Sequence, residues 1–332
     1  MEYRVLGESD LAVSTICMGC WALAGDRMWG PQDEEEAIAA LRTAVEVGIN
    51  FFDTAEAYGN GRSESILGRA FRDIRDKVVI ATKVSTSHMR PDDLRRACEN
   101  SLRRLQTDYI DIYYLHWPSR EVPFSETMGE MARLQSEGKV RWVGCSNFGK
   151  QDLAALLQVG RVEVNQLAYS LLFRAIEYEI VPACLENHVS IAAYSPLLHG
   201  ILTGKFASLD EVPDERARTR HFSSARRPLT RHGEPGAEAE TAEALRRIRD
   251  ICDQAGLPMA QVALAWVLAQ PGVATVVAGA RRPEQVRANA EAASLRLSED
   301  VLEALREATD PLKAKLGPNA DMWQGGANSR IR

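Results

Sequence analysis

The sequence predicts an α/β fold in which eight parallel strands form a (β/α)8 TIM barrel. Eight short apolar runs, rich in β-branched residues, alternate with longer amphipathic stretches along the chain. Such runs suit parallel strands, because helices cover both faces of a parallel sheet and leave no polar face. The length of 332 residues fits one barrel domain over 1–332, and no linker divides it.

Each apolar run is expected to end at the same rim of the barrel. The runs end, in chain order, at Gly19, Asp53, Lys83, His116, Asn147, Gln166, Ser195 and Gly279. A turn over 7–10 predicts an N-terminal hairpin ahead of the first run. Helices are expected between the runs, for example over 33–47, 91–105, 124–136 and 283–292, where acidic residues near the start suit the helix dipole.

Two segments have no clear strand or helix period. The segment over 198–239 follows the seventh run and is rich in Gly, Pro, Arg and Ser, so we expect a long loop at the barrel mouth. The tail over 310–332 is also expected to be irregular. It either folds over the same mouth or contacts another copy in a homo-oligomer.

The composition excludes several classes of protein. With 45% hydrophobic residues, 26% charged residues and a net charge of −6, the chain has no basic block that would bind nucleic acid. No apolar run approaches the roughly 18 residues that cross a bilayer, and the start lacks a signal sequence, so we expect no membrane association and a cytoplasmic location.

The six cysteines are too sparse for a disulfide framework. Cys17 and Cys20 form one C-x-x-C, which on a strand would point to opposite faces. Since no second C-x-x-C completes a zinc site, no metal is expected.

Charged residues close three of the apolar runs, and a nearby tyrosine makes them a candidate catalytic group. In such a barrel the chemistry lies at the C-terminal ends of the strands, where Asp53, Lys83 and His116 would meet. Tyr58 follows in the loop after Asp53. An ammonium about 4 Å from a phenol supplies roughly the 3–4 kcal/mol that lowers its pKa by two to three units. We therefore expect Lys83 to lower the pKa of Tyr58, Asp53 to hold Lys83, and neutral His116 to orient a substrate carbonyl.

These residues lie in motifs that resemble the aldo-keto reductase family. The motifs are DTAEAYG over 53–59, GRSE over 61–64, ATK over 81–83, LHWP over 115–118, GCSN over 144–147, VNQ over 164–166, YSPL over 194–197, LTGK over 202–205 and AGAR over 278–281. The resemblance also extends to potassium channel β-subunits of that family. It implies an oxidoreductase in which Tyr58 is the general acid and Lys83 and Asp53 adjust the pKa of Tyr58. His116 would orient the carbonyl of an aldehyde, ketone or sugar. The alcohol would be oxidised in the reverse direction.

The resemblance also implies where a nicotinamide dinucleotide and the substrate bind. The cofactor residues would be Gly19, Cys20, Trp21, Asp53, Ser146, Asn147, Gln166, Tyr194, Ser195, Pro196, Leu197, Gly200, Lys205, Gly279, Ala280, Arg281, Arg282, Gln285 and Asn289. The substrate, a small carbonyl compound or alcohol, would contact Trp21, Trp29, Tyr58, His116 and Trp117. Trp142 and Trp266 are instead expected to serve packing.

Two arginines favour NADP(H) over NAD(H). Arg281 and Arg282 follow the eighth run, where two guanidinium groups would clamp a 2′-phosphate. No G-x-G-x-x-G follows a strand, so a Rossmann site is not expected. The chain departs from the family pattern at Ala278, where proline is common, at Ala288, where an acidic residue is frequent, and at His199, where glycine is usual.

Two other functions remain open from the sequence. A cofactor-sensing binding subunit would retain the dinucleotide with little turnover. A lyase or aldolase would use Lys83 as a Schiff-base nucleophile, but such an enzyme needs no nicotinamide-binding motifs.

Overall fold

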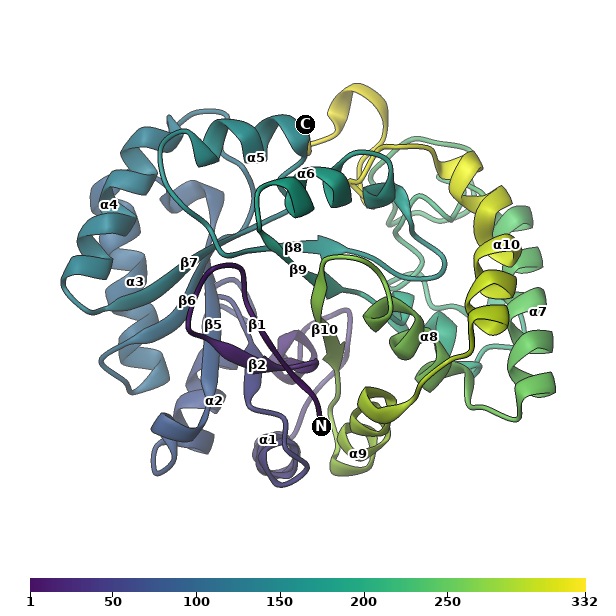
Figure 1. The fold of residues 1–332 in the computed structure, drawn as a ribbon, viewed down its shortest axis with the longest axis horizontal. Coiled ribbons are helices and arrows are strands. Elements are labelled where there is room, and N and C mark those ends of the chain that lie inside the picture. The colour runs from purple at the N-terminus through teal and green to yellow at the C-terminus, as the bar shows by residue number, and fades with distance from the viewer.

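Eight parallel strands close into a barrel in the computed structural model, which confirms the predicted fold (Figure 1). The structure describes residues 1–332, apart from the side chain of Ala327. Around the barrel the strands run in the order β10, β3, β4, β5, β6, β7, β8, β9. They are β3 (Ile16–Gly19), β4 (Phe51–Asp53), β5 (Val79–Val84), β6 (Ile110–Leu115), β7 (Val140–Ser146), β8 (Val164–Ala168), β9 (Ser190–Tyr194) and β10 (Val273–Gly279).

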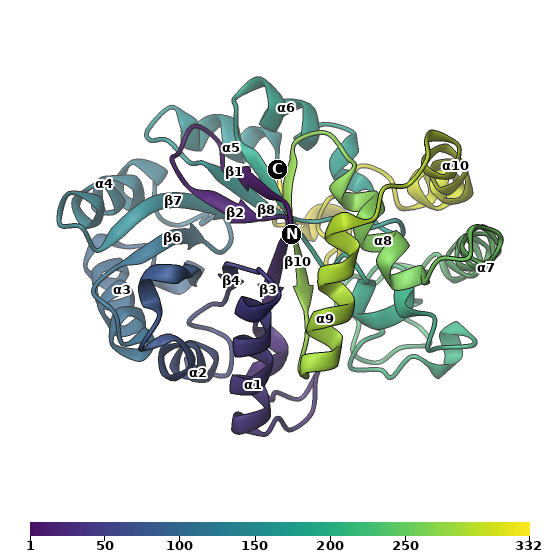
Figure 2. The same cartoon turned by 60° about the horizontal axis from the view of Figure 1, so that its bottom comes forward.

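Helices surround the barrel on its outer side (Figures 1 and 2). They are α1 (Glu34–Glu46), α2 (Arg62–Phe71), α3 (Pro91–Leu105), α4 (Phe124–Ser136), α5 (Lys150–Leu157), α6 (Ile180–Glu186), α7 (Glu238–Ala255), α8 (Met259–Leu268), α9 (Pro283–Glu291) and α10 (Glu299–Leu316). In the described residues no single helix is long and apolar enough to span a membrane. The pair α7 and α8, taken together, has the length and composition of a span, but the two helices are bent by 98° relative to each other.

The N-terminal hairpin closes one end of the barrel. It pairs β1 (Tyr3–Val5) with β2 (Ala12–Ser14), as the turn predicted. Its buried Leu6, Leu11 and Val13 share one apolar cluster with the inward-facing Cys17 and Phe51. Figure 2 shows the hairpin in front of the strands at this end. The hairpin does not cover the opposite end of the barrel, where the strands end.

The two cysteines of the C-x-x-C lie on opposite sides of the barrel wall. Cys17 belongs to the cluster inside the barrel, whereas Cys20, just after β3, belongs to the core between strands and helices. All six cysteines are buried and free.

A buried glutamate fixes β5 against the helices. The fully buried carboxylate of Glu64 on α2 accepts hydrogen bonds from Thr82 Oγ1 at 2.6 Å and from Arg104 Nε on α3 at 2.5 Å. Thr82 points outward to this carboxylate, and strand alternation therefore points the next residue, Lys83, into the barrel.

The irregular tail begins later than the sequence predicted. We expected it from Asp310, but α10 continues through Pro311 to Leu316. Proline lacks the N–H that would bond to the carbonyl four residues earlier. In the structure Arg247 Nη1 of α7 donates to that carbonyl, on Glu307, at 3.2 Å. The burial of Leu312 and Leu316 also favours continuation of the helix.

The tail and the long loop fold against each other at the barrel mouth. The loop holds only short 3-10 turns before α7 begins at Glu238, close to its predicted end. Arg220 of the loop donates to the backbone oxygens of Asn319 at 3.0 Å and Leu316 at 2.8 Å. Beyond them, the N–H of Arg332 donates to Asp152 Oδ2 of α5 at 2.9 Å. The tail therefore folds over its own barrel, which is one of the two expected arrangements.

We predict that Arg104→Leu destabilises the fold by about 3 kcal/mol, because the buried Glu64 carboxylate would lose its charged partner. Urea unfolding followed by circular dichroism measures the change. The matched control is Arg96→Leu, since the side chain of Arg96 is 69% exposed and pairs only with the neighbouring Asp93. Equal stabilities of the two variants would contradict a structural role for the Glu64–Arg104 pair.

Candidate active site

A cavity of about 830 Å³ opens at the C-terminal ends of the strands. Nearly all of the residues predicted to bind cofactor or substrate line it, including Trp29 and Trp117. Two predicted site residues do not. Lys83 is fully buried behind Tyr58, and Asn289 hydrogen-bonds the backbone oxygen of Gly279 at 3.3 Å, so it supports the cavity wall.

Lys83 is the centre of a buried hydrogen-bond network. Its Nζ donates to Asp53 Oδ1 at 2.6 Å, to the backbone oxygen of Thr54 at 2.8 Å and to the Tyr58 hydroxyl at 3.1 Å. All three hydrogens of the ammonium are thereby used. Burial alone would lower the pKa of Lys83, but Asp53 and Tyr58 raise it above its usual value. The lysine therefore stays charged.

The pKa of Tyr58 differs from the sequence-based expectation. The distance to Lys83 is short, as expected, but burial of the phenol outweighs the lowering effect of Lys83, and the negative charge of Asp53 also opposes it. The pKa of Tyr58 is consequently raised, not lowered. The phenol is protonated near neutral pH and can donate a proton.

The ring of His116 lies next to that of Tyr58 in the cavity lining. The two ring centroids are 6.0 Å apart and the rings are nearly perpendicular, at 80°. Burial, together with the charges of Lys83 and Arg330, lowers the pKa of His116 to about 3. The ring is therefore neutral, as predicted, and offers one donor and one acceptor nitrogen.

Four polar side chains at the ends of β7, β8 and β9 form a second hydrogen-bonded group. Tyr194 donates to Asn147 Oδ1 at 2.8 Å, and Asn147 Nδ2 donates to Ser146 Oγ at 3.0 Å. Gln166 Nε2 donates to Asp53 Oδ2 at 2.7 Å, which joins this group to the network around Lys83. The group presents hydroxyl and amide functions that suit a carboxamide.

The loop after β9 has the chemistry of a phosphate-binding site. Ser195, Leu198, His199 and Gly200 all have positive φ, between 41° and 93°. Turns of this kind expose backbone N–H groups to an anion. Lys205 lies beside Gly200, with Nζ 3.0 Å from the position of a Cβ there, and forms no salt bridge in the described chain. This donor set fits the pyrophosphate of a nicotinamide dinucleotide.

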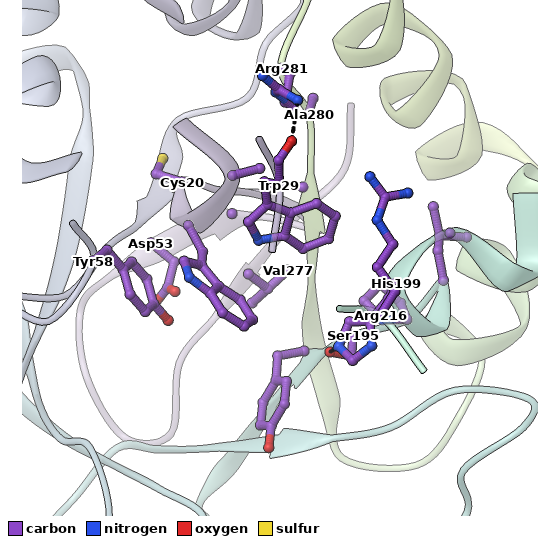
Figure 3. A pocket seen from close by; sticks show the side chains of 18 of the residues that line it. Cys20, Trp29, Asp53, Tyr58, Ser195, His199, Arg216, Val277, Ala280 and Arg281 are labelled. Carbon is purple, nitrogen blue, oxygen red and sulfur yellow. Dashed lines mark hydrogen bonds between the residues drawn. The ribbon is translucent and has the colours of Figure 1, made fainter. Parts of the chain in front are cut away.

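The two arginines after β10 are not equally available. Arg281 donates to the backbone oxygen of Trp29 at 2.6 Å (Figure 3). It also donates to the backbone oxygen of Pro31 and to the side chain of Gln32. The expected pair of free guanidinium groups is thus reduced to one. Arg282 pairs only with the nearby Glu284 and is 53% exposed.

Aromatic rings form the wall between these two regions. Trp21 stacks on Tyr58 with centroids 5.9 Å apart, and Trp29 meets Trp21 edge-on at 5.8 Å. Figure 3 shows Tyr58 and Asp53 on one side of Trp29 and Ser195, His199 and Arg216 on the other. Trp323 of the tail stacks on His199 at 5.1 Å. As expected, Trp266 is fully buried elsewhere, and Trp142 packs at the hairpin end.

The sequence reasoning did not assign several residues of the cavity. They come from the loop over 198–239, the tail and α1: His199, Arg216, Arg218, Arg231, Arg330 and Glu36. Trp323, which was expected to shape the pocket, does line it. The excess of arginine in the loop was the available signal. The sequence does not show which of these arginines face the cavity, so their role could not be inferred from it.

Comparison with known proteins agrees with this geometry. The model of the "Aldo/keto reductase family" matches residues 15–310. The chain belongs to this family. Members among its relatives include a protein named "NADH-specific methylglyoxal reductase" from Escherichia coli, 32% identical over 94% of this chain and 100% of the relative. A rice (Oryza sativa) protein named "Probable voltage-gated potassium channel subunit beta" is 32% identical over 88% of this chain and 91% of its own length.

A solved structure of the same family matches the fold as well. An aldo-keto reductase from Klebsiella pneumoniae in complex with NADPH superposes with a TM-score of 0.73 at 32% identity, covering 92% of this chain and 95% of the other. Family and fold together support an oxidoreductase that uses a nicotinamide cofactor.

The low pKa of His116 predicts acid-sensitive stability. Its pKa is about 3 in the folded protein and near 6.5 when unfolded, so below pH 6.5 the unfolded state binds the extra proton. This group's contribution is complete above pH 6.5 and falls as the pH decreases, by up to about 1.4 kcal/mol per pH unit. Urea titrations at pH 7.5, 6 and 5 should give a shallower pH slope for His116→Gln than for wild type. Parallel slopes would contradict the lowered pKa of His116.

Proposed function

We propose that this protein reduces aldehydes, ketones or sugars to alcohols, and oxidises alcohols in the reverse direction, with NADP(H). The proposal rests on one observation: the half-buried Tyr58, whose pKa is raised, accepts a hydrogen bond from the fully buried ammonium of Lys83 at the base of a large cavity. A bound reduced nicotinamide supplies the hydride. The chain's own residues supply the proton and the orientation.

Tyr58 is the proposed proton donor to the carbonyl oxygen. As the proton leaves, negative charge develops on the phenol oxygen 3.1 Å from Lys83 Nζ, which stabilises it. Asp53 keeps Lys83 charged and fixed, since their 2.6 Å bond is fully shielded from water. Neutral His116, facing Tyr58, orients the carbonyl by a hydrogen bond without competing for the proton.

The cofactor would be held by three groups already described. Ser146, Asn147 and Gln166 suit the carboxamide, with Tyr194 beside the ring, and the Ser195–Gly200 loop with Lys205 suits the pyrophosphate. Trp21 and Trp29, in edge-to-face contact at the cavity wall, would limit the access of water to the reacting groups.

The Schiff-base alternative requires a neutral lysine. Lys83 uses all three hydrogens in bonds to acceptors, and its pKa is raised, so its nitrogen has no lone pair to offer. This arrangement supports proton transfer by Tyr58 over nucleophilic attack by Lys83.

We expect Tyr58→Phe to lower kcat/KM for carbonyl reduction by about 10²- to 10⁴-fold, because it removes the proton donor. Cofactor affinity, measured by calorimetry, should change little. Tyr113→Phe is the matched control, since it also removes one buried hydroxyl, but on the outer side of the barrel wall. Absorbance at 340 nm with a panel of aldehydes and aldoses gives the rates. Full activity of Tyr58→Phe would refute the role of Tyr58, and tight NADPH binding without turnover of any carbonyl by wild type would favour a cofactor-sensing subunit.

The preference for NADP(H) is carried by Arg282 and Arg281. The Klebsiella relative was solved with NADPH, whereas the Escherichia coli relative is named as NADH-specific, so cofactor choice differs between relatives and must come from local residues. Arg282 has an exposed guanidinium for a 2′-phosphate, and Arg281 holds the loop of Trp29 beside it.

Removing Arg282 should therefore affect one cofactor selectively. We expect Arg282→Ala to raise the Kd of NADPH by about 10- to 100-fold, the effect of one lost charge-assisted hydrogen bond, and to leave the Kd of NADH nearly unchanged. Arg287→Ala, on the exposed face of α9 and paired with Glu46, is the control. Equal losses for NADPH and NADH would exclude a 2′-phosphate contact of Arg282.

A further inference from the structure

The cavity is far more positive than the protein around it. Seven lysine and arginine side chains but only two carboxylates line it, in a chain whose net charge is −6. Both histidines in the lining, His116 and His199, are neutral because burial lowers the pKa of each to about 3. The excess charge therefore comes from side chains that remain cationic at any physiological pH.

A dinucleotide accounts for three of these cations. Lys205 and Arg216 both approach Gly200 in the proposed pyrophosphate loop, and Arg282 follows β10 at the proposed 2′-phosphate position. A fourth, Arg281, is bound to the backbone oxygens of Trp29 and Pro31. A fifth, Arg330, is already neutralised. Its guanidinium makes two bonds, of 2.8 and 2.9 Å, to the fully buried carboxylate of Asp321.

Arg218 and Arg231 remain without a charge partner. In the part of the chain that the structure describes, neither forms a salt bridge, and neither side chain donates a hydrogen bond to the protein. Arg218 Nε is completely buried and still has no acceptor. Burial and the neighbouring positive charges of Arg231 and Arg27 lower the pKa of Arg218, so this charged guanidinium would be stabilised by a bound anion. A buried, unpaired donor of this kind is rare unless a ligand completes it.

These two arginines lie beyond the aromatic wall that starts at Tyr58. The guanidinium carbon of Arg218 is 5.8 Å from the ring centroid of Trp323, which stacks on His199. The nearby Asp26 is hydrogen-bonded by Trp21, the residue stacked on Tyr58. Arg218 thus borders the loop that forms the proposed substrate side of the cavity.

We propose that Arg218 and Arg231 form a binding subsite for an anionic group, so that the preferred carbonyl substrate carries a carboxylate or a phosphate away from its reacting carbonyl. This inference rests on the proposed function, since it assigns a substrate class to the same cavity. Arg218 supplies a planar fork that binds either oxyanion. Trp323 holds the fork in place, and Arg231 adds a second positive charge at the rim.

The test compares charged and neutral substrates of similar size. At 0.15 M salt with saturating NADPH, kcat/KM is measured for succinic semialdehyde against butanal, and for glyceraldehyde 3-phosphate against glyceraldehyde. We expect wild type to prefer one anionic member over its neutral match by about 10-fold or more, and the pair concerned distinguishes carboxylate from phosphate.

Variants assign the preference to the subsite. Arg218→Gln should lower kcat/KM for the anionic substrate by about 10- to 100-fold and leave the neutral match nearly unchanged, while Arg218→Lys restores part of the loss. Arg226→Gln, which changes an exposed arginine of the same loop paired with Asp210, is the control. Equal losses for charged and neutral substrates would indicate a structural role and overturn the inference, as would the absence of any anionic preference in wild type.

A binding measurement separates this inference from the proposed function. If no carbonyl is reduced, the proposed function fails, and calorimetry of succinate and of inorganic phosphate with the NADPH complex still decides the subsite. Binding that is lost in Arg218→Gln supports it. Absence of binding of both anions to wild type, or equal binding to wild type and Arg218→Gln, overturns it.

Discussion

The ion pair between Lys83 and Asp53 is the interaction on which the rest of the site depends. Two opposite charges buried this deeply are stable only when every remaining donor and acceptor is paired. The backbone oxygen of Thr54, the Tyr58 hydroxyl and the amide of Gln166 meet that requirement. Gln166 and Asp53, which are hydrogen-bonded to each other, are 113 residues apart in the sequence. Closure of the barrel is therefore a condition for keeping the lysine charged, and in the proposed mechanism the charged lysine is a condition for proton transfer from Tyr58.

The mouth of the barrel combines two kinds of surface with different purposes. The strand ends and the loop after β4 supply the groups proposed to transfer a proton and to orient the substrate, whereas the long loop and the tail supply arginines and aromatic rings. The bonds of Arg220 to the tail join these two segments into one layer over the mouth. Variation in this layer changes which molecule enters without disturbing the buried pair beneath it.

The sequence predicted what depends on local pattern. The eight strand ends, the hairpin and the cluster of Asp53, Tyr58, Lys83 and His116 follow from apolar runs and from motifs that retain their spacing. The direction of the Tyr58 pKa did not follow, because burial of the phenol depends on packing against Trp21, which the charges alone do not reveal. Arg281 donates hydrogen bonds to a loop about 250 positions earlier in the chain. The carbonyl that Pro311 leaves without a partner in α10 is instead bonded by Arg247 of α7. Long-range partners of this kind leave no local signal.

The distribution of tryptophan has an optical consequence. Of six tryptophans in the chain, Trp21, Trp29, Trp117 and Trp323 line the cavity, while Trp142 and Trp266 lie away from it. Near-ultraviolet emission of the protein therefore originates largely from the walls of the site. A reduced nicotinamide absorbs in the range where indole emits, so energy transfer from these rings would report binding of the reduced cofactor without any added label.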